Sequence, residues 1–366
     1  MLVALWRGRS DNLGRVLLHS HYDVVPAFPA SWASDPFVPV VKDGRIYARG
    51  TQDMKCVSMQ YIEAIAAIQR ANATNVSPFE RTIALSFTPD EEVGGVEGAG
   101  LFVASPAFQE LRAAVGLDEG LANPEDAFTV FYGERAPWWV TVRANGATGH
   151  GSRFIAGTAV EKLLKFINAA MAFRAEQEAR LHADKGCSHA ARLGDVVTVN
   201  LTMLKAGVAG SPAMGGYALN VIPEEAYAGF DIRIPPSVPM DEMQSIIETW
   251  RGGDDSIEVL FNVRVPEHCV TNIEPVASGG TPWWPPLLDA ISNAGEIKVV
   301  TEVFPAATDG RFFRKAKVPV FGFSPIRNTP ILLHDHNEFL PVDVFMQGIE
   351  VYTRVLKSLA SNVELP

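Results

Sequence analysis

Residues 16–23, VLLHSHYD, place a short apolar run directly before two histidines and an acid. Consecutive apolar residues of this kind are typical of a strand that is buried on both faces. The pattern returns in TIALSFTPDEE (82–92) and AAVGLDE (113–119), and apolar residues at helical spacing from Met54 to Ala71 lie between the first two runs. Strand, helix and strand in this order predict an α/β fold with an at least partly parallel sheet.

The middle of the chain shows a different pattern. Strand-like runs at 138–143, 196–204, 226–234 and 257–265 are interrupted by helical spacing at 158–181 and 241–250. This order predicts an α+β layer in which one antiparallel sheet is covered on one face. After residue 275 the α/β pattern returns. We therefore expect a split catalytic domain, 1–135 and 271–366, and an inserted domain at 136–270.

Composition excludes several classes of protein. The 366 residues are 47% hydrophobic and 20% charged, an ordinary globular balance. With 31 basic against 42 acidic residues, the net charge of −11 argues against nucleic acid as a partner. No run approaches 18 apolar residues, so no membrane span is expected. Three scattered cysteines, an odd number, favour a reducing compartment, and we expect a cytoplasmic protein.

Acids and histidines gather at the predicted strand ends. Ligands of open α/β sheets bind beyond the carboxyl ends of the strands. Imidazole together with carboxylates suits Zn²⁺ better than Ca²⁺ or Mg²⁺, and the acids outnumber the needs of one ion, so two ions sharing a carboxylate are indicated. The residues concerned are His21, Asp23, Asp53, Glu91, Glu92, Asp118, Glu119, His334 and His336.

The local sequence suggests a specific role for Asp23 and for one member of the pair Glu91 and Glu92. Asp23 lies two positions after His21, so in a continuing strand it can accept the ring N–H that fixes the imidazole tautomer. Glu91 and Glu92 would face opposite ways in an extended segment, leaving one free as a general base. Each motif alone has a simpler interpretation: Asp53 as a helix N-cap and Glu91-Glu92 as a solvated loop.

Taken together, the motifs carry a resemblance. LLHSHYDVVP, RIYARGTQDMK, PDEEVGG, LDEG and HDHNE resemble the metallopeptidase family M20, and within it the aminoacylases. Further matching stretches are ERAPWW from Glu134, GHGSRF from Gly149, NVIP from Asn220 and AATDGR from Ala306. The resemblance extends from about Val16 to near the end of the chain. It implies a catalytic domain of the zinc-peptidase type with a mixed sheet, and an inserted lid and dimerisation domain.

The resemblance also implies roles for single residues. Two Zn²⁺ per chain are expected, although Co²⁺ or Mn²⁺ would fit the same ligands. Glu91 is expected to be the general base, with Asp23 holding His21. For the last ligand, His334 is preferred over His336 because a glutamate, Glu338, follows four positions later. The expected metal ligands are His21, Asp53, Glu92, Glu119 and His334.

The inserted domain is expected to contribute three residues. The resemblance makes His150 a residue that stabilises the oxyanion in the site of a partner subunit, which implies a homodimer. It makes Asn220 and Arg233 substrate-binding residues, and Arg233 suits the free carboxylate of a substrate. The alternatives are a capping histidine in a glycine-rich turn, an asparagine in a turn and an arginine that is ion-paired on a sheet surface.

The expected reaction is hydrolysis of the amide bond of N-acyl-L-amino acids to a carboxylate and a free amino acid. One alternative is a zinc carboxypeptidase or dipeptidase of the same family, which differs only in its pocket. Another is a catalytically silent scaffold protein, considered because the chain begins almost at the first expected strand.

Overall fold

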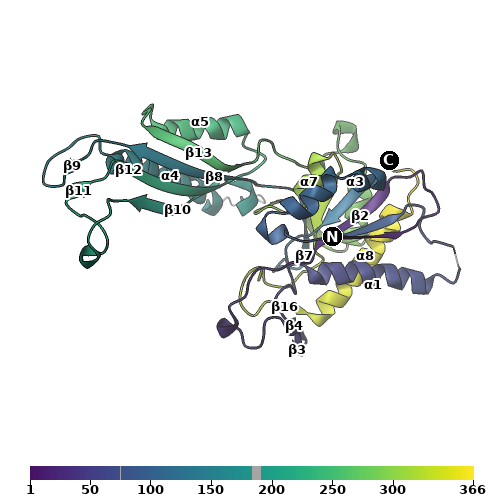
Figure 1. The fold of residues 1–366 in the computed structure, drawn as a ribbon. Coiled ribbons are helices and arrows are strands. Elements are labelled where there is room, and N and C mark those ends of the chain that lie inside the picture. Colours follow the sequence, from purple (N-terminus) through teal and green to yellow (C-terminus); the bar gives the residue numbers. More distant parts are fainter. Residues whose placement is uncertain (75, 184–190) are drawn as a thin grey trace. The chain divides into compact units, whose positions relative to one another are not determined.

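The computed structural model describes residues 1–74, 76–183 and 191–366 (Figure 1). The chain divides into two compact units. The first comprises Met1–Gly133, Cys269–Phe304 and Thr308–Pro366, and the second comprises Glu134–His268 and Pro305–Ala307. The division thus falls at 133/134 and 268/269, where the sequence suggested 135/136 and 270/271, and a short later segment joins the second unit.

The first unit is built on a mixed seven-stranded sheet. Its strand order is β1-β5-β2-β6-β15-β7-β14. The central strands β5, β2, β6 and β15 are parallel neighbours, whereas β1 pairs antiparallel with β5 and β7 antiparallel with β15. The strands are β1 (Leu2–Trp6), β2 (Arg15–His21), β5 (Ile83–Thr88), β6 (Ala113–Asp118), β7 (Ala127–Glu134), β14 (Lys298–Phe304) and β15 (Val320–Phe323).

Helices cover both faces of this sheet. Val16 and Leu18 of β2 pack into a core with α1 (Lys55–Ala71), α6 (Trp284–Ser292) and α8 (Val342–Ala360). Leu17, between them, points the other way into a smaller core with α2 (Leu101–Ala104), α3 (Pro106–Leu111) and α7 (Gly310–Lys315). This alternation explains why β2 reads as a continuous apolar run. The α/β class and the mixed sheet are confirmed.

Some elements of the first unit were not expected from the sequence. They are the edge strand β1, strands β7 and β14, helix α8 and a small sheet of β16 (Phe339–Pro341), β4 (Arg45–Tyr47) and β3 (Val40–Lys42). Helix α1 begins at Lys55 with Met54 as its N-cap, so Asp53 is not the helix cap. Among the helices of the described residues, none combines the length and apolar character needed to cross a bilayer.

The second unit contains an antiparallel sheet of order β10-β12-β8-β13. In β8 the residues Trp138, Val140 and Val142 are buried, and the residue between the first two, Trp139, is 48% exposed. The buried set packs against α4 (Ala159–His182) and α5 (Met240–Arg251) on one face. The strands are β8 (Ala136–Asn145), β10 (Thr198–Ala206), β12 (Glu225–Ile234) and β13 (Ile257–Arg264).

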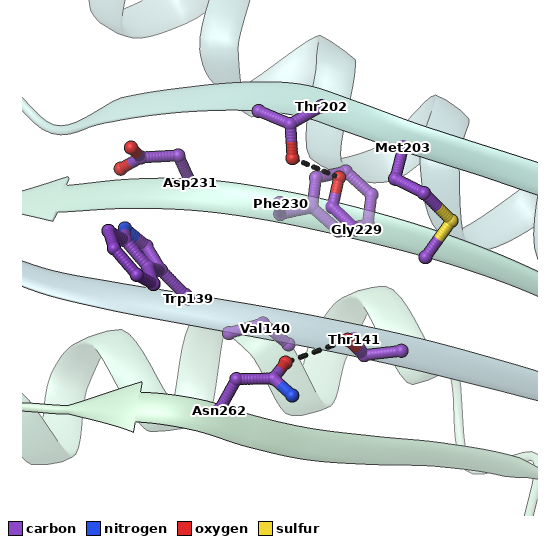
Figure 2. Close-up of a pocket in the computed structure, with 9 residues that line it drawn as sticks. All are labelled: Trp139, Val140, Thr141, Thr202, Met203, Gly229, Phe230, Asp231 and Asn262. Atoms are coloured by element: carbon purple, nitrogen blue, oxygen red, sulfur yellow. Dashed lines mark hydrogen bonds between the residues drawn. The ribbon is translucent and has the colours of Figure 1, made fainter.

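The opposite face of this sheet holds a shallow pocket of about 370 Å³. Figure 2 shows Trp139, Thr141 and Asn262 along it, with Thr141 donating a hydrogen bond to the Asn262 side chain at 2.7 Å. None of the site residues expected from the sequence lines this pocket, although Asp231, a neighbour of Arg233, does.

Candidate metal centre

Parallel strands bring the expected residues to one edge of the sheet. His21 is the last residue of β2, and Glu119 directly follows β6, its parallel neighbour. Glu91 and Glu92 come shortly after β5, which pairs with β2 on the other side. The edge is therefore lined by side chains from three adjacent strand ends, as the sheet rule for ligand sites requires.

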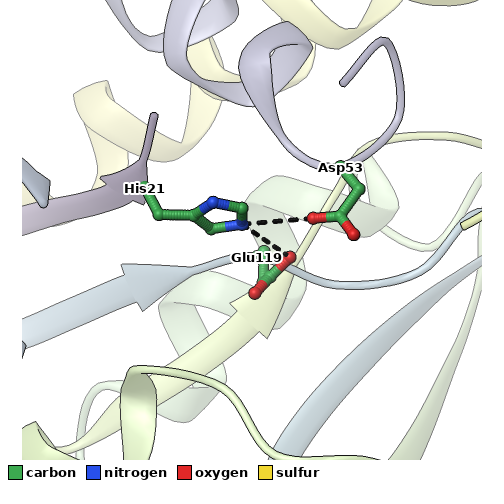
Figure 3. A group of neighbouring side chains, drawn as sticks. All are labelled: His21, Asp53 and Glu119. Carbon is green, nitrogen blue, oxygen red and sulfur yellow. Dashed lines mark hydrogen bonds and ion pairs between the residues drawn. The ribbon is translucent and has the colours of Figure 1, made fainter. Parts of the chain in front are cut away.

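The first group consists of His21, Asp53 and Glu119, all buried (Figure 3). The Nε2 atom of His21 lies 3.1 Å from Asp53 Oδ1 and 3.6 Å from Glu119 Oε2. Asp53 enters from the loop before α1, so three separate segments converge. One imidazole and two carboxylates directed at one point form a donor set that suits a zinc ion.

The second group consists of Asp53, Glu92 and His334. His334 Nε2 lies 3.2 Å from Asp53 Oδ2 and 3.1 Å from Glu92 Oε2. The two oxygens of Asp53 thus face different histidines, which is the arrangement of a carboxylate shared between two ions. His336, the competing ligand, instead places its ring edge-on to Phe28, with the ring centres 6.2 Å apart.

Asp23 contacts His21, although not through the predicted continuing strand, because β2 ends at His21. The Nδ1 atom of His21 lies 3.4 Å from Asp23 Oδ1 and 3.1 Å from the backbone oxygen of the same residue. The other carboxylate oxygen accepts the backbone N–H of Glu92 at 3.1 Å. Asp23 therefore links the His21 ring to the turn that carries the two glutamates.

Glu91 and Glu92 do not lie in an extended segment, so that expectation was wrong. They form a 3₁₀ turn, Glu91–Val93, flanked by Asp90 and Gly94 with positive φ. The sequence offered a warning, since Gly94-Gly95 favours a turn. Glu92 belongs to the second group, whereas Glu91 belongs to neither.

Burial, hydrogen bonds and neighbouring charges shift the pKa values of the site. Burial and the charge of Asp53 raise the pKa of Glu119 well above its usual range. Burial, aided by the charges of Asp309 and Asp53, raises the pKa of Glu91 to about 9. Hydrogen bonds to Asp53 and Glu92 raise the pKa of His334 to about 10.

Burial and neighbouring groups act in opposite directions on the pKa values of His21 and Asp53. Burial alone would lower the pKa of His21, but the charge of Glu119 and the bonds with Asp23 and Asp53 raise it well above its usual range. Burial would raise the pKa of Asp53, but the bonds with His21 and His334 lower it instead.

These residues fit divalent ions. Three carboxylates are packed together where burial makes charge costly unless it is compensated. Glu92 Oε1 is buried and has no hydrogen-bond partner within the described ranges, so it is a ready donor for an ion. Histidine with carboxylates is a donor set for Zn²⁺ and similar ions.

The remaining expected residues lie in the second unit. His150 is exposed, in β9 (Gly149–His150), which pairs with β11 (Val221–Ile222), and its Nδ1 lies 2.8 Å from Ser152 Oγ. Asn220 is adjacent, because its backbone oxygen accepts the N–H of Gly151 at 2.7 Å. Arg233 donates two hydrogen bonds to Asp231, at 2.7 and 3.0 Å.

Sequence reasoning missed polar residues behind the ligands. Gln52 and Glu338 are buried and connect the loop of Asp53 to the segment of His334. His19 and Asp309, also buried, are 3.0 Å apart beside the strand ends. Asp309 lies in the AATDGR stretch, which was noted only for its family resemblance, and a polar residue such as Gln52 beside an expected ligand gives no local signal.

Comparison with known proteins gives concordant matches. A model of peptidase family M20/M25/M40 matches residues 17–358. Aminoacylase-1 of Dictyostelium discoideum is 47% identical over 97% of this chain and 84% of its own length. Aminoacylase-1 of Sus scrofa is 44% identical over 100% and 84%. The solved structure of a dinuclear metal-binding M20 peptidase from Bacillus subtilis superposes with a TM-score of 0.62, at 15% identity, over 98% of this chain and 84% of that one.

Proposed function

The chain belongs to peptidase family M20/M25/M40, and we propose that within this family it is a zinc-dependent amidohydrolase that cleaves N-acyl-L-amino acids. The products are a carboxylate and a free amino acid. The substrate class is supported by the aminoacylase-1 relatives at 44–47% identity over nearly the whole chain. The proposed two-metal chemistry rests on one observation: the two carboxylate oxygens of Asp53 face different histidines, His21 and His334.

We assign two ions to the two groups of ligands. His21, Asp53 and Glu119 would hold one, and Asp53, Glu92 and His334 the other. Zinc is the proposed metal, with cobalt or manganese compatible with the same donors. When bound, such ions supply Lewis acidity and make a water molecule acidic near neutral pH.

The protein supplies the proton transfers. Glu91 belongs to neither group, yet its charge interacts with His21, Asp53 and Glu92, so its carboxylate lies beside both groups and is free to accept and return a proton. It takes a proton from the attacking water and delivers it to the nitrogen of the leaving amino acid. Asp23 keeps the His21 ring oriented so that its Nε2 faces Asp53 and Glu119.

We propose that the inserted domain, 136–270, acts as a lid and dimerisation domain. Asn220 and Arg233 would bind the substrate, and His150 would stabilise the oxyanion in the site of a second copy of the chain. The exposure of His150 and the proximity of the Asn220 backbone support this assignment. Since Arg233 is paired with Asp231, binding of a substrate carboxylate has to share or displace that partner. We also propose a cytoplasmic location, which the odd cysteine count supports.

Metal analysis combined with two substrates tests the proposal. We expect about two zinc ions per chain by elemental analysis, and hydrolysis of N-acetyl-methionine in preference to a dipeptide. Preference for the dipeptide would indicate a peptidase instead. A folded protein that binds no zinc would contradict the assignment of the centre. Light scattering tests the proposed homodimer.

A further inference from the structure

We propose that Gln52 is a positioning residue that, together with Glu338, fastens the loop of His334 to the loop of Asp53 and so assembles the second metal site before any ion binds. This proposal rests on the two-ion centre of the proposed function. It concerns residues that belong to neither group of candidate metal ligands.

The side-chain amide of Gln52 makes three hydrogen bonds to the backbone of the loop that carries His334. Its Nε2 donates to the backbone oxygens of Pro330 at 3.1 Å and Phe339 at 2.8 Å, and its Oε1 accepts the N–H of Leu332 at 3.0 Å. The side chain is buried, with 2% exposed. Both N–H groups of a primary amide and one lone pair of its oxygen are thus spent on the segment that surrounds His334.

Glu338 fastens the same two segments in the opposite direction. It belongs to the His334 segment and is fully buried, and its carboxylate accepts the backbone N–H groups of Gly50 at 3.1 Å, Gln52 at 2.5 Å and Asp53 at 3.3 Å. The guanidinium of Arg49 donates to it at 2.8 Å. Because bonds to a charged acceptor are stronger than neutral ones, this carboxylate fixes the backbone that presents Asp53.

The His334 loop depends on such bonds more than the other ligand segments do. His334 and Asn337 both have positive φ, at 63° and 55°, a conformation that costs free energy for residues other than glycine. The side chain of His334 is 56% exposed, so burial contributes little to holding it. His21 and Glu119, by contrast, are buried at strand ends. Loss of the Gln52 bonds therefore affects the second site and spares the first.

The test uses Gln52→Glu, which keeps an acceptor for the Leu332 N–H but sets oxygen against the oxygens of Pro330 and Phe339. Zinc is titrated into the metal-free full chain against a competing chelator. We expect the second ion to bind about 10- to 100-fold more weakly, the range seen when outer partners of metal ligands are removed, while the first ion is unaffected. His334→Ala provides the reference for a chain that has lost a ligand of the second site.

A matched control is Gln60→Glu. Gln60 is also a buried glutamine of the first unit, and its Nε2 donates to the backbone oxygen of Phe345 at 3.0 Å, away from the His334 loop. This variant should retain both zinc affinities. If Gln52→Glu binds both ions as the parent does, or weakens both equally, the proposal is wrong. If the parent chain itself binds fewer than two ions, the proposed two-ion centre fails instead.

A second measurement does not require the variant to fold. Hydrogen exchange in the metal-free parent should show slow exchange at the amides of Gln52, Asp53 and Leu332, since each donates within the fastening. Fast exchange at all three, as in an open loop, would show that the two loops are joined only when metal binds and would overturn the proposal.

Discussion

Glu91 and Glu92 are neighbours in one turn, yet only Glu92 faces His334. Replacing Glu91 by Gln removes the proton acceptor and preserves the shape of the side chain. We predict that kcat for N-acetyl-methionine falls by about 10²- to 10⁴-fold while both zinc ions stay bound. Stopped assays together with elemental analysis check this. Glu97→Gln, an exposed glutamate of the next turn, is the control and should retain activity. Loss of zinc from Glu91→Gln would instead make Glu91 a ligand.

Arg233 has a planar fork that a lysine cannot reproduce. We predict that Arg233→Lys raises KM for N-acetyl-methionine about tenfold or more and changes kcat less, because the free carboxylate is held in the ground state and the transition state alike. The control is Arg143→Lys, on the same open sheet face, where the arginine pairs with Glu225. An unchanged KM in Arg233→Lys would remove this residue from the substrate site.

At the scale of elements, helix α8 matters because its buried side joins α1 and α6 in the main core. Leu356 in this helix is fully buried. We predict that Leu356→Ala lowers the free energy of unfolding by about 2–5 kcal/mol, measured by urea denaturation, and leaves KM unchanged. Lys357→Ala, at the next and exposed position, should change stability by no more than about 0.5 kcal/mol. Equal losses in both variants would contradict the packing described.

The same scale shows what sequence reasoning can reach. The strands before His21, Glu91 and Glu119 were predictable because burial on both faces leaves unbroken apolar runs. The turn of Glu91 was misjudged because its 3₁₀ form depends on positive φ at Asp90 and Gly94. The hydrogen bonds of the Gln52 side chain could not be predicted from the sequence, because their partners lie about 280 positions away in the chain. Chemistry at strand ends is local in sequence, whereas the bonds that align it are not.

For the whole molecule, the shifted acidities predict how stability depends on pH. The pKa values of Glu91, Glu119, His21 and His334 are all raised in the folded chain. Such groups stabilise the fold when the pH lies below their ordinary pKa values, 4.5 for glutamate and 6.5 for histidine. This stabilisation is lost as pH rises toward the pKa values of the folded chain, about 9 for Glu91 and about 10 for His334. We predict that the melting temperature of the metal-free protein decreases as the pH is raised from about 5 to about 9.

Zinc should reverse much of this trend. Ions bind the deprotonated ligands, so they gain affinity over the same interval in which the metal-free fold loses stability. Thermal melts of chelator-treated and zinc-loaded protein, run side by side from pH 5 to pH 9, compare the two. The gap between the two melting temperatures should widen as pH rises. A constant gap would mean that the carboxylates of the centre are ionised throughout.

The thiol of Cys56 can report how often the loop that carries Asp53 opens. Its thiol donates to the backbone oxygen of Gln52 at 3.5 Å and is buried, and burial together with the charge of Glu338 raises its pKa. A thiol reagent therefore modifies it only during moments when this part of the chain opens, because the closed form offers neither access nor thiolate. Mass spectrometry of the Cys56 peptide gives the labelling rate, which measures how often these openings occur. The rate should decrease when zinc holds Asp53 in place.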